Sequence, residues 1–187
     1  MTDQSTPIQT QTEQATISYR RAVKQDAAYI AQMVNSAYRG DSSRSGWTTE
    51  ADLLTGTRID AEEVCNLLEA DHSVILLCLQ NEQIIGCVHL EKTLDAAYLG
   101  MFVVKPGLQG GGIGKQFMQA AEDLVQAEWG VKKMWMTVIS VRKELIAYYE
   151  RRGYQQNGKV KPFPAEVPDE FRLVKDLQMV EMEKVLG

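Results

Sequence analysis

The stretch 103–116, "VVKPGLQGGGIGKQ", holds four glycines within the five positions 110–114. It follows an apolar run and precedes a segment whose apolar residues recur with helical spacing. Glycines let the backbone approach an anion closely, and the start of a helix supplies N–H groups that have no acceptor within the helix. The stretch is therefore either a phosphate-binding loop or a tight turn between a strand and a helix.

Two common phosphate-binding patterns do not fit this loop. A Walker A loop aligned on its last Gly-Lys pair needs a glycine in place of Gln109 and a hydroxyl residue in place of Gln116. A dinucleotide-binding fingerprint needs its third glycine in place of Lys115 or Phe117, and an acidic residue after the next strand. The pattern that does fit is Gln-x-x-Gly-x-Gly, which begins at Gln109.

A second motif follows about forty residues later, with a predicted strand between the two. The segment 147–154, "AYYERRGY", roughly matches A-x-x-Y-x-x-x-G-F/Y, with Tyr149 four residues before Gly153. With both motifs in this order, the chain resembles the GNAT superfamily of acyl-CoA-dependent N-acyltransferases. The resemblance extends from about Ile17 to the C-terminus, and the diagnostic part lies between Tyr98 and Tyr154.

This resemblance implies both a fold and an activity. The fold is α/β, a single mixed, mostly antiparallel central sheet with a splayed, bulged strand at the acetyl-CoA cleft and helices on both faces. Gly100 lies in the middle of the apolar run 97–104, where a glycine often marks a bulge. The implied reaction is direct transfer of an acetyl group from acetyl-CoA to a primary amine, most simply a small or amino-acid-like molecule.

The resemblance also implies where acetyl-CoA binds. The loop backbone and the helix start would hold the pyrophosphate, and exposed backbone of the splayed strand would hold the pantetheine arm. An N–H group near Met101 or Phe102 would polarise the thioester carbonyl. The implied cofactor-binding residues are Phe102, Val103, Val104, Gln109, Gly110, Gly111, Gly112, Ile113, Gly114 and Lys115.

For catalysis, the second motif places Tyr149 at the family's general-acid position. A phenol donates a proton without being charged at neutral pH, although a tyrosine on an amphipathic helix also suits a core. Tyr148 is predicted to be a packing residue. The general base stays open between His89, Glu91 and water. Arg142 stands where many family members have an asparagine, and it would either meet a cofactor phosphate or cap its helix.

The acceptor site is expected from the polar segment 39–60 and the proline-rich loop 159–171. Its candidate contacts are Tyr38, Arg39, Arg44 and Trp47. Arginines bind carboxylates or phosphates, and the aromatic rings suit an apolar or flat group. Two rival functions are an acetyltransferase for protein N-termini or lysines, which needs an open groove, and a sensor that binds acetyl-CoA without turnover.

Composition limits the other possibilities. The 187 residues suit one domain, predicted at 17–187 after a disordered polar tail at 1–16. A net charge of −5 argues against a nucleic-acid partner. No apolar stretch approaches membrane-helix length, and three cysteines without a CxxC pair beside two histidines do not predict a metal site. We expect a cytoplasmic protein, either a monomer or a homodimer.

Hydrophobic periodicity and turn residues predict the secondary structure. Helices are expected at 26–38, 60–70, 112–129 and 142–153. Strands are expected at 17–23, 97–104, 133–139 and 177–186, with a hairpin over 73–93. Asp26 is the predicted N-cap of the first helix, and Asp60 with Glu63 forms a predicted capping box on the second.

Overall fold

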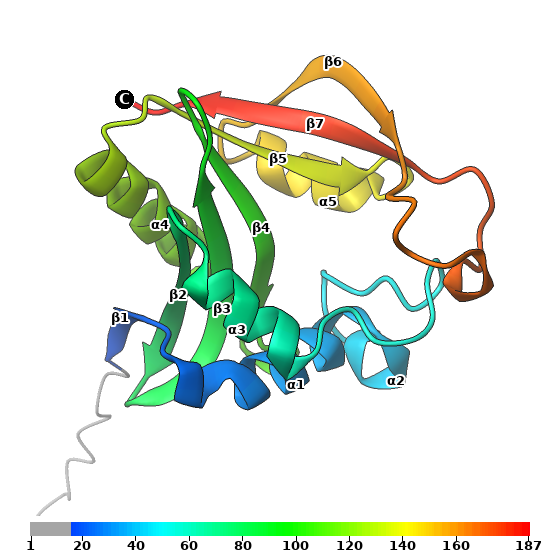
Figure 1. Ribbon diagram of the computed structural model, residues 1–187, viewed down its shortest axis with the longest axis horizontal. Coiled ribbons are helices and arrows are strands. Elements are labelled where there is room, and N and C mark those ends of the chain that lie inside the picture. Colours follow the sequence, from blue (N-terminus) through cyan, green and yellow to red (C-terminus); the bar gives the residue numbers. More distant parts are fainter. Residues whose placement is uncertain (1–15) are drawn as a thin grey trace, which may run out of the picture.

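The computed structural model describes residues 16–187, so the predicted tail 1–16 lies outside the described part of the chain except for Thr16. Seven strands form one mixed sheet in the order β1-β2-β3-β4-β5-β7-β6 (Figure 1). The strands are β1 Ile17–Arg21, β2 Ser73–Gln80, β3 Gln83–Lys92, β4 Ala97–Val104, β5 Lys133–Ile139, β6 Gln155–Pro162 and β7 Gln178–Val185. The α-helices are α1 Ala27–Tyr38, α2 Gly40–Ser43, α3 Ala61–Glu69, α4 Ile113–Trp129 and α5 Lys143–Glu150. Three short 3-10 helices complete the set, at Lys24–Asp26, Pro106–Leu108 and Asp169–Phe171.

Helices cover both faces of the sheet, as the sequence predicted. Alternate side chains of a strand point to opposite faces. On β2, Ile75 and Leu77 pack with α1 and α3, whereas Leu76 and Cys78 pack in the core that includes α4 and α5. These four side chains are at most 5% exposed, and burying an aliphatic side chain contributes roughly 1.5–3 kcal/mol. The apolar run of β2 is therefore continuous because both of its faces are buried.

The sheet opens between β4 and β5, which is the feature that makes room for a site. The two strands pair in parallel where Ala97 and Tyr98 face β5, and they then diverge (Figure 1). Just past Gly100, Met101 takes the left-handed conformation with φ of 53°, and the register of β3 opposite shifts between Cys87 and His89. This bulge turns the end of β4 away from β5, which confirms the predicted bulged and splayed strand.

The predicted cap on α3 is confirmed and the predicted cap on α1 is not. Asp60 Oδ1 accepts from the Glu63 N–H at 2.8 Å, and Glu63 Oε2 accepts from the Asp60 N–H at 2.8 Å. Asp26 precedes α1, but its side chain makes no capping bond there. Its carboxylate instead accepts from Arg20 and from the Val23 N–H, because the 3-10 turn before α1 points it back toward β1.

Two elements differ from the prediction. β6 occupies 155–162, where part of a proline-rich loop was expected at 159–171. It is an edge strand that pairs with β7, and nearly all of its side chains are exposed, so it lacks the apolar alternation that marks a half-buried strand. The one-turn helix α2 lies within the predicted polar loop, and its side chains are too polar to show a helical stripe.

Candidate active site

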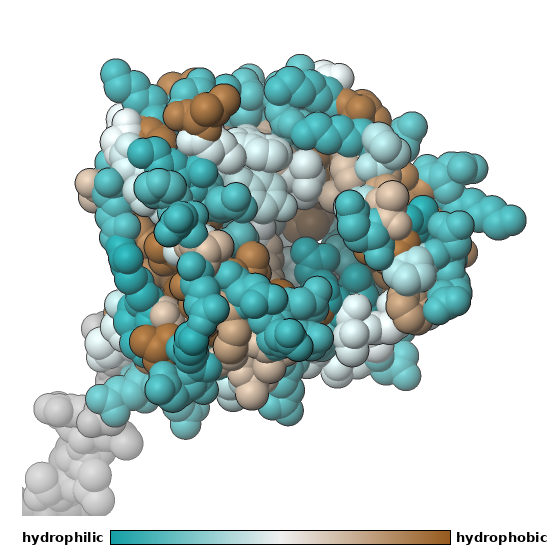
Figure 2. Space-filling model, viewed as in Figure 1, coloured by the Kyte–Doolittle hydropathy of each residue, from teal (hydrophilic) through white to brown (hydrophobic). Residues whose placement is uncertain are grey.

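Two cavities meet where the sheet opens. The loop cavity, of about 270 Å³, lies beside the glycine-rich loop and the start of α4. The central cavity, of about 380 Å³, lies between the two halves of the sheet, and Figure 2 shows the hollow in this face of the molecule. Phe102 of β4 and Leu145 and Tyr149 of α5 line both cavities. A molecule in one cavity can therefore touch a molecule in the other beside Tyr149.

The lining of the loop cavity is cationic. Lys115, Arg151 and Arg152 line it, and of the described lining residues none carries a carboxylate. Arg152 is half-buried, and its guanidinium lies 3.3 Å from the centre of the Tyr148 ring. Positive side chains around a helix start form a site for an anionic ligand.

The start of α4 adds free backbone donors to these charges. Gly112 is its N-cap residue with φ of 81°, and its carbonyl accepts from the N–H groups of Lys115 and Gln116, each at 3.1 Å. The N–H groups of Ile113 and Gly114 find no acceptor within residues 16–187. Of the predicted loop contacts, Gln109, Gly110, Gly112, Gly114 and Lys115 line the loop cavity.

The end of β4 presents its backbone to the opening of the sheet. The Lys105 N–H bonds to the Ile85 carbonyl of β3, so alternation turns the backbone groups of Val104 away from β3. The Val104 carbonyl accepts from Gln109 Nε2 at 2.8 Å, and the Phe102 carbonyl accepts from the Tyr38 hydroxyl at 3.0 Å. Gln109 thus bonds the chain itself, and its Oε1 also accepts from the Trp47 N–H at 2.8 Å. The predicted Val103 is fully buried against α1.

Tyr149 lies at the junction of the two cavities, and its hydroxyl is free to bond a ligand. Its ring is 6% exposed, and within the described chain its hydroxyl makes no hydrogen bond. Burial, and secondarily the neighbouring Tyr38 and Tyr148, raise the pKa of Tyr149 well above its usual value. The group therefore keeps its proton at neutral pH.

Tyr148, which the sequence predicted to be a packing residue, lines the loop cavity. Its hydroxyl lies over Gly114, where an added Cβ would come within 2.6 Å of it. Its ring is tilted against Trp47 with centroids 5.8 Å apart. Both adjacent tyrosines therefore line the loop cavity, and Tyr149 also lines the central cavity.

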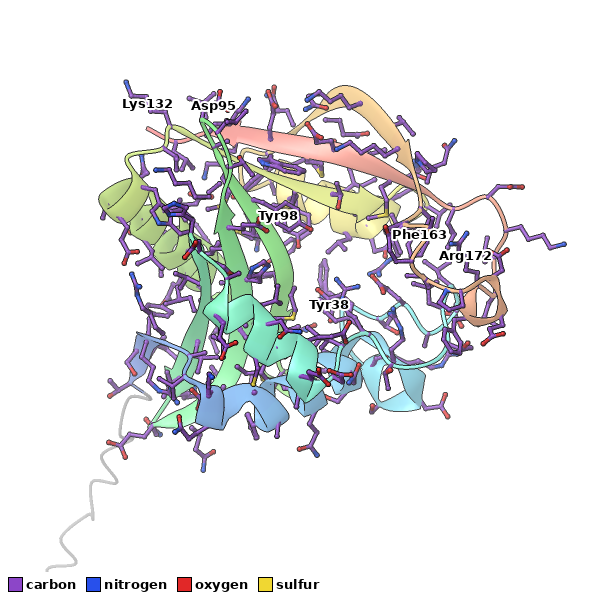
Figure 3. The ribbon with its side chains drawn as sticks, in the orientation of Figure 1. Tyr38, Asp95, Tyr98, Lys132, Phe163 and Arg172 are labelled. Carbon is purple, nitrogen blue, oxygen red and sulfur yellow. The ribbon has the colours of Figure 1, made fainter. Side chains whose placement is uncertain are left out.

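The central cavity is closed on one side by two segments distant in sequence. The Thr55 N–H donates to the Phe171 carbonyl at 2.8 Å, and the Leu173 N–H donates to the Leu53 carbonyl at 2.9 Å. These bonds join the segment after α2 to the loop after β6 (Figure 1). Tyr38, Tyr98 and Phe163 lie on three sides of the cavity (Figure 3).

The structure separates the four predicted acceptor contacts. Tyr38 and Arg39 line the central cavity. Trp47 lines the loop cavity instead, because its backbone is tied to Gln109. Arg44 lines neither cavity, and its exposed side chain contacts Asp41 and Asp52.

Arg142 holds two segments together. Its side chain is nearly buried, and its guanidinium donates to the Trp47 carbonyl, to the Thr48 carbonyl at 3.5 Å and to Glu144 at 2.6 Å. It occupies the N-cap position of α5 but makes no side-chain capping bond. It fixes the start of α5 against the segment that follows α1.

Of the two residues considered as a base, His89 lines the central cavity, whereas Glu91 is exposed and lies outside it. The Ser73 hydroxyl donates its hydrogen to the Leu67 carbonyl at 2.6 Å, so its 2.9 Å contact with His89 Nε2 requires the imidazole to donate. His89 Nδ1 is then the lone-pair nitrogen, and it makes no hydrogen bond within residues 16–187. Burial lowers the pKa of His89, which keeps the ring neutral.

The described chain shows neither a metal-binding cluster nor a membrane-spanning helix. Residues 16–187 contain no group of three His, Cys, Asp or Glu side chains that could hold a metal ion. In the same range, no helix has the length and apolar character needed to cross a membrane.

A mixed sheet that opens between two strands, with helices on both faces, is the fold of solved GNAT acetyltransferases. The chain belongs to the GNAT acetyltransferase family, because the protein-family model described as "Acetyltransferase (GNAT) family" matches residues 30–154. A search of curated proteins found no match.

Solved structures of this fold resemble the chain at low sequence identity. A GNAT-family acetyltransferase from Streptococcus pneumoniae matches with a TM-score of 0.63 and 20% identity, over 92% of this chain and 100% of that one. The ribosomal-protein-S18-alanine N-acetyltransferase from Escherichia coli matches with a TM-score of 0.65 and 15% identity, over 92% and 95%. A spermidine N-acetyltransferase from Vibrio cholerae, solved with CoA and spermine, matches with a TM-score of 0.66 and 16% identity, over 90% and 95%. These likenesses concern the fold.

Proposed function

We propose that this protein transfers an acetyl group from acetyl-CoA to the primary amine of a small molecule. The observation that carries the proposal is the junction of the two cavities at Tyr149, with a cationic helix start beside one cavity and the central cavity, which two joined segments close on one side, as the other. Acetyl-CoA supplies the activated acetyl thioester. The chain has to hold the two reactants together, orient them and move protons.

The loop cavity suits the phosphates of acetyl-CoA. In our proposal the N–H groups of Ile113 and Gly114 and the side chain of Lys115 bind the pyrophosphate, with Arg151 and Arg152 adding positive charge. The glycines of the lining support this, because without side chains they leave the backbone donors open to a ligand. The backbone of Phe102 and Val104, turned toward the opening of the sheet, is the proposed support for the pantetheine arm.

Two side chains are proposed to move protons. Tyr149 keeps a proton on its hydroxyl and gives it to the departing sulfur. His89 accepts the proton of the acceptor amine at Nδ1, directly or through water, because Ser73 fixes the tautomer. Both groups line the central cavity, His89 from β3 and Tyr149 from α5.

A small acceptor is favoured over a protein chain by the closure of the central cavity. The bonds between Thr55 and Phe171, and between Leu53 and Leu173, join two segments across one side of the central cavity, and in our proposal this leaves less room for an extended peptide. Arg172 braces the same loop by donating to the Val167 carbonyl at 2.7 Å. An open groove, which a protein substrate requires, is not what these contacts build.

The direct test is release of free thiol from acetyl-CoA over a panel of small amines, a polyamine and a peptide with a free N-terminus. Turnover with small amines and none with the peptide is the expected result. Turnover confined to the peptide would favour the protein acetyltransferase. Tight binding of acetyl-CoA with no thiol release for any amine would favour the sensor.

His89 gives the reaction a predicted pH dependence. Because a base must be neutral and burial lowers the pKa of His89 below 6.5, log kcat/KM, calculated for the neutral form of the amine, should rise with pH through that lowered value and then level off. His89→Gln should remove this acid limb and lower kcat about 100-fold.

The second histidine of the chain, exposed His72, provides the matched control. His72→Gln should keep both the acid limb and the rate. An acid limb that survives in His89→Gln would assign it to another group.

A further inference from the structure

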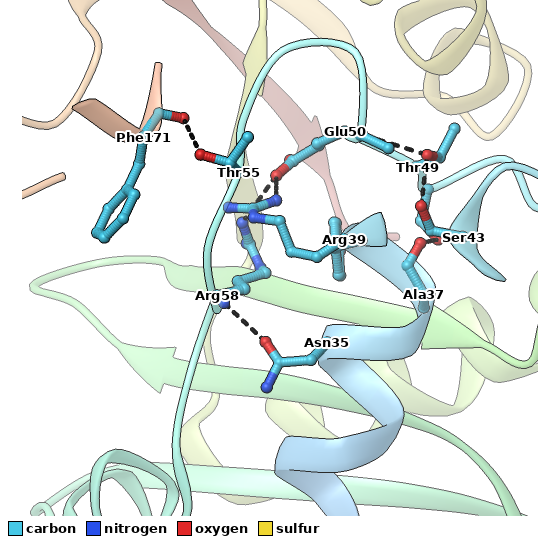
Figure 4. Close-up of polar contacts among 12 residues, drawn as sticks. Asn35, Ala37, Arg39, Ser43, Thr49, Glu50, Thr55, Arg58 and Phe171 are labelled. Atoms are coloured by element: carbon cyan, nitrogen blue, oxygen red, sulfur yellow. Dashed lines mark hydrogen bonds and ion pairs between the residues drawn. The ribbon is translucent and has the colours of Figure 1, made fainter. Parts of the chain in front are cut away.

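The wall of the central cavity carries a charge cluster formed by Arg39, Glu50 and Arg58 (Figure 4). Glu50 Oε2 contacts Arg39 Nη1, and Arg58 Nη1 lies 3.4 Å from the same oxygen. The side chains of Arg39 and Glu50 are 10% and 8% exposed. One carboxylate therefore faces two guanidinium groups in a place that water reaches poorly.

The charge of the second arginine is not balanced by another carboxylate among the described residues that line the cavity. Glu50 is the one carboxylate among those residues. The third arginine of the lining, Arg142, has its donors on Glu144 and on the carbonyls of Trp47 and Thr48. A buried charge without a partner is costly, so a net positive cavity wall is a site for an anion.

Both arginines keep donors that the described chain does not use. Arg39 Nε is buried and has no hydrogen-bond partner within residues 16–187. The Arg58 side chain makes a single hydrogen bond there, the long one to Glu50, and is 32% exposed. A guanidinium has five N–H donors arranged as a fork that matches a carboxylate. Most of the fork of Arg58 is therefore available.

Arg58 is held in place rather than free to swing. Its backbone N–H donates to Asn35 Oδ1 of α1 at 2.6 Å. Its guanidinium lies over the Tyr38 ring, 4.1 Å from the centroid. A preorganised arginine loses less conformational entropy when it binds a ligand.

Tyr38 connects this cluster to the junction of the cavities. One face of its ring carries Arg58, and its hydroxyl bonds the Phe102 carbonyl, which lies where the two cavities meet. The free donors thus lie one tyrosine side chain away from the proposed transfer point. An acceptor whose amine sits at that point can reach Arg58 with its other end.

We propose that the acceptor amine carries a carboxylate and that Arg58, backed by Arg39, binds it. This rests on the proposed function, since it names the class of acceptor for the same cavity. A carboxylate matches the single excess positive charge and the planar fork of Arg58. A polyamine is disfavoured, because its second ammonium group would lie against the arginines.

The test compares acceptors of matched length: a series of ω-amino acids, their amides, the corresponding diamines and the aminoalkyl phosphonates. Thiol release should give the amino acids a kcat/KM about 10- to 100-fold above the amides, with the diamines lowest. A preference for the phosphonates would make the bound group a phosphate-like anion. Equal or better use of amides or diamines would overturn the proposal.

Substitution of Arg58 locates the effect. Arg58→Gln should raise KM for the amino acids by about 10- to 100-fold with little change in kcat, and leave the amides unchanged. Arg58→Lys, which keeps the charge without the fork, should fall in between. Arg21→Gln, which removes an exposed arginine on β1, is the matched control and should change neither. Equal losses for amino acids and amides would assign Arg58 a structural role.

Calorimetry separates failure of this inference from failure of the proposed function. The amino acids and amides are titrated into the protein in the presence of free CoA. Amino-acid binding that disappears in Arg58→Gln, without thiol release in any assay, would keep the carboxylate site and reject the transferase. Thiol release with amides alone would keep the transferase and reject the carboxylate site. The carboxylate site would also be rejected if the amino acids showed neither binding nor turnover.

Discussion

Replacing Tyr149 with phenylalanine is expected to lower kcat about 100-fold and to leave the affinity for acetyl-CoA almost unchanged. The ring, which is 6% exposed, keeps its packing, and only the hydroxyl is lost. That hydroxyl bonds nothing in the described chain, so its removal leaves no orphaned partner. Its contribution belongs to the transition state, since the ground state does not need the proton.

Steady-state kinetics with calorimetric titration of acetyl-CoA measures this effect. Tyr29→Phe is the control, because Tyr29 lines neither cavity: its hydroxyl donates to the Ile84 carbonyl of β3 and accepts from Lys105 Nζ. A loss seen in KM alone would make Tyr149 a binding residue. Unchanged kinetics would make it a core residue, with water as the source of the proton.

Most of the fold was predictable because its signals are local. α4 shows them clearly: its apolar stripe includes Phe117 and Ala121, both fully buried, and Gly130 ends it in the left-handed conformation. The bulge was expected near Gly100 and lies at Met101. β6 was missed, because an exposed edge strand is held by backbone pairing with β7 and needs no apolar pattern.

The candidate site, like the fold, was predictable only where its residues belong to a local pattern. Tyr149 and the glycine-rich loop could be proposed as site residues because each belongs to a short motif, and the structure places both in the lining of the loop cavity. Trp47 was expected at the acceptor and lies at the loop cavity, since its position depends on Gln109, 62 residues away. Arg58 was not singled out at all. Its polar segment has no periodicity, and the role that we propose for it depends on its contacts with Glu50 and with the Tyr38 ring, which no local pattern reveals.

Gly114→Val is the second large change, with an expected loss of acetyl-CoA affinity of about 100-fold or more. An added Cβ would lie 2.6 Å from the Tyr148 hydroxyl. The Tyr148 ring is held under Arg152 and against Trp47, so displacing it fills the loop cavity. Calorimetry with acetyl-CoA measures the loss, and the melting temperature should hardly change because the contact is with a side-chain end.

Two other glycines provide the comparison. Gly112→Ala places a side chain at φ of 81°, which should cost about 1–2 kcal/mol of folding free energy and lower the melting temperature as well. Gly107→Ala meets nothing within 4 Å and should change neither stability nor binding. Tight binding retained by Gly114→Val would show that the phosphates bind elsewhere.

A double substitution identifies what fills the space above Gly114. The atom that an added Cβ meets is the Tyr148 hydroxyl, and the ring carbon behind it is 3.8 Å away. Gly114→Ala adds this Cβ alone and should also weaken acetyl-CoA binding. If displaced Tyr148 blocks the cavity, adding Tyr148→Phe should restore most of the affinity that Gly114→Ala loses. If affinity is not restored, the new methyl group itself occupies the place of a phosphate oxygen. In either case the backbone N–H of Gly114, which has no acceptor in the described chain, can bind a phosphate only while the space above it stays open.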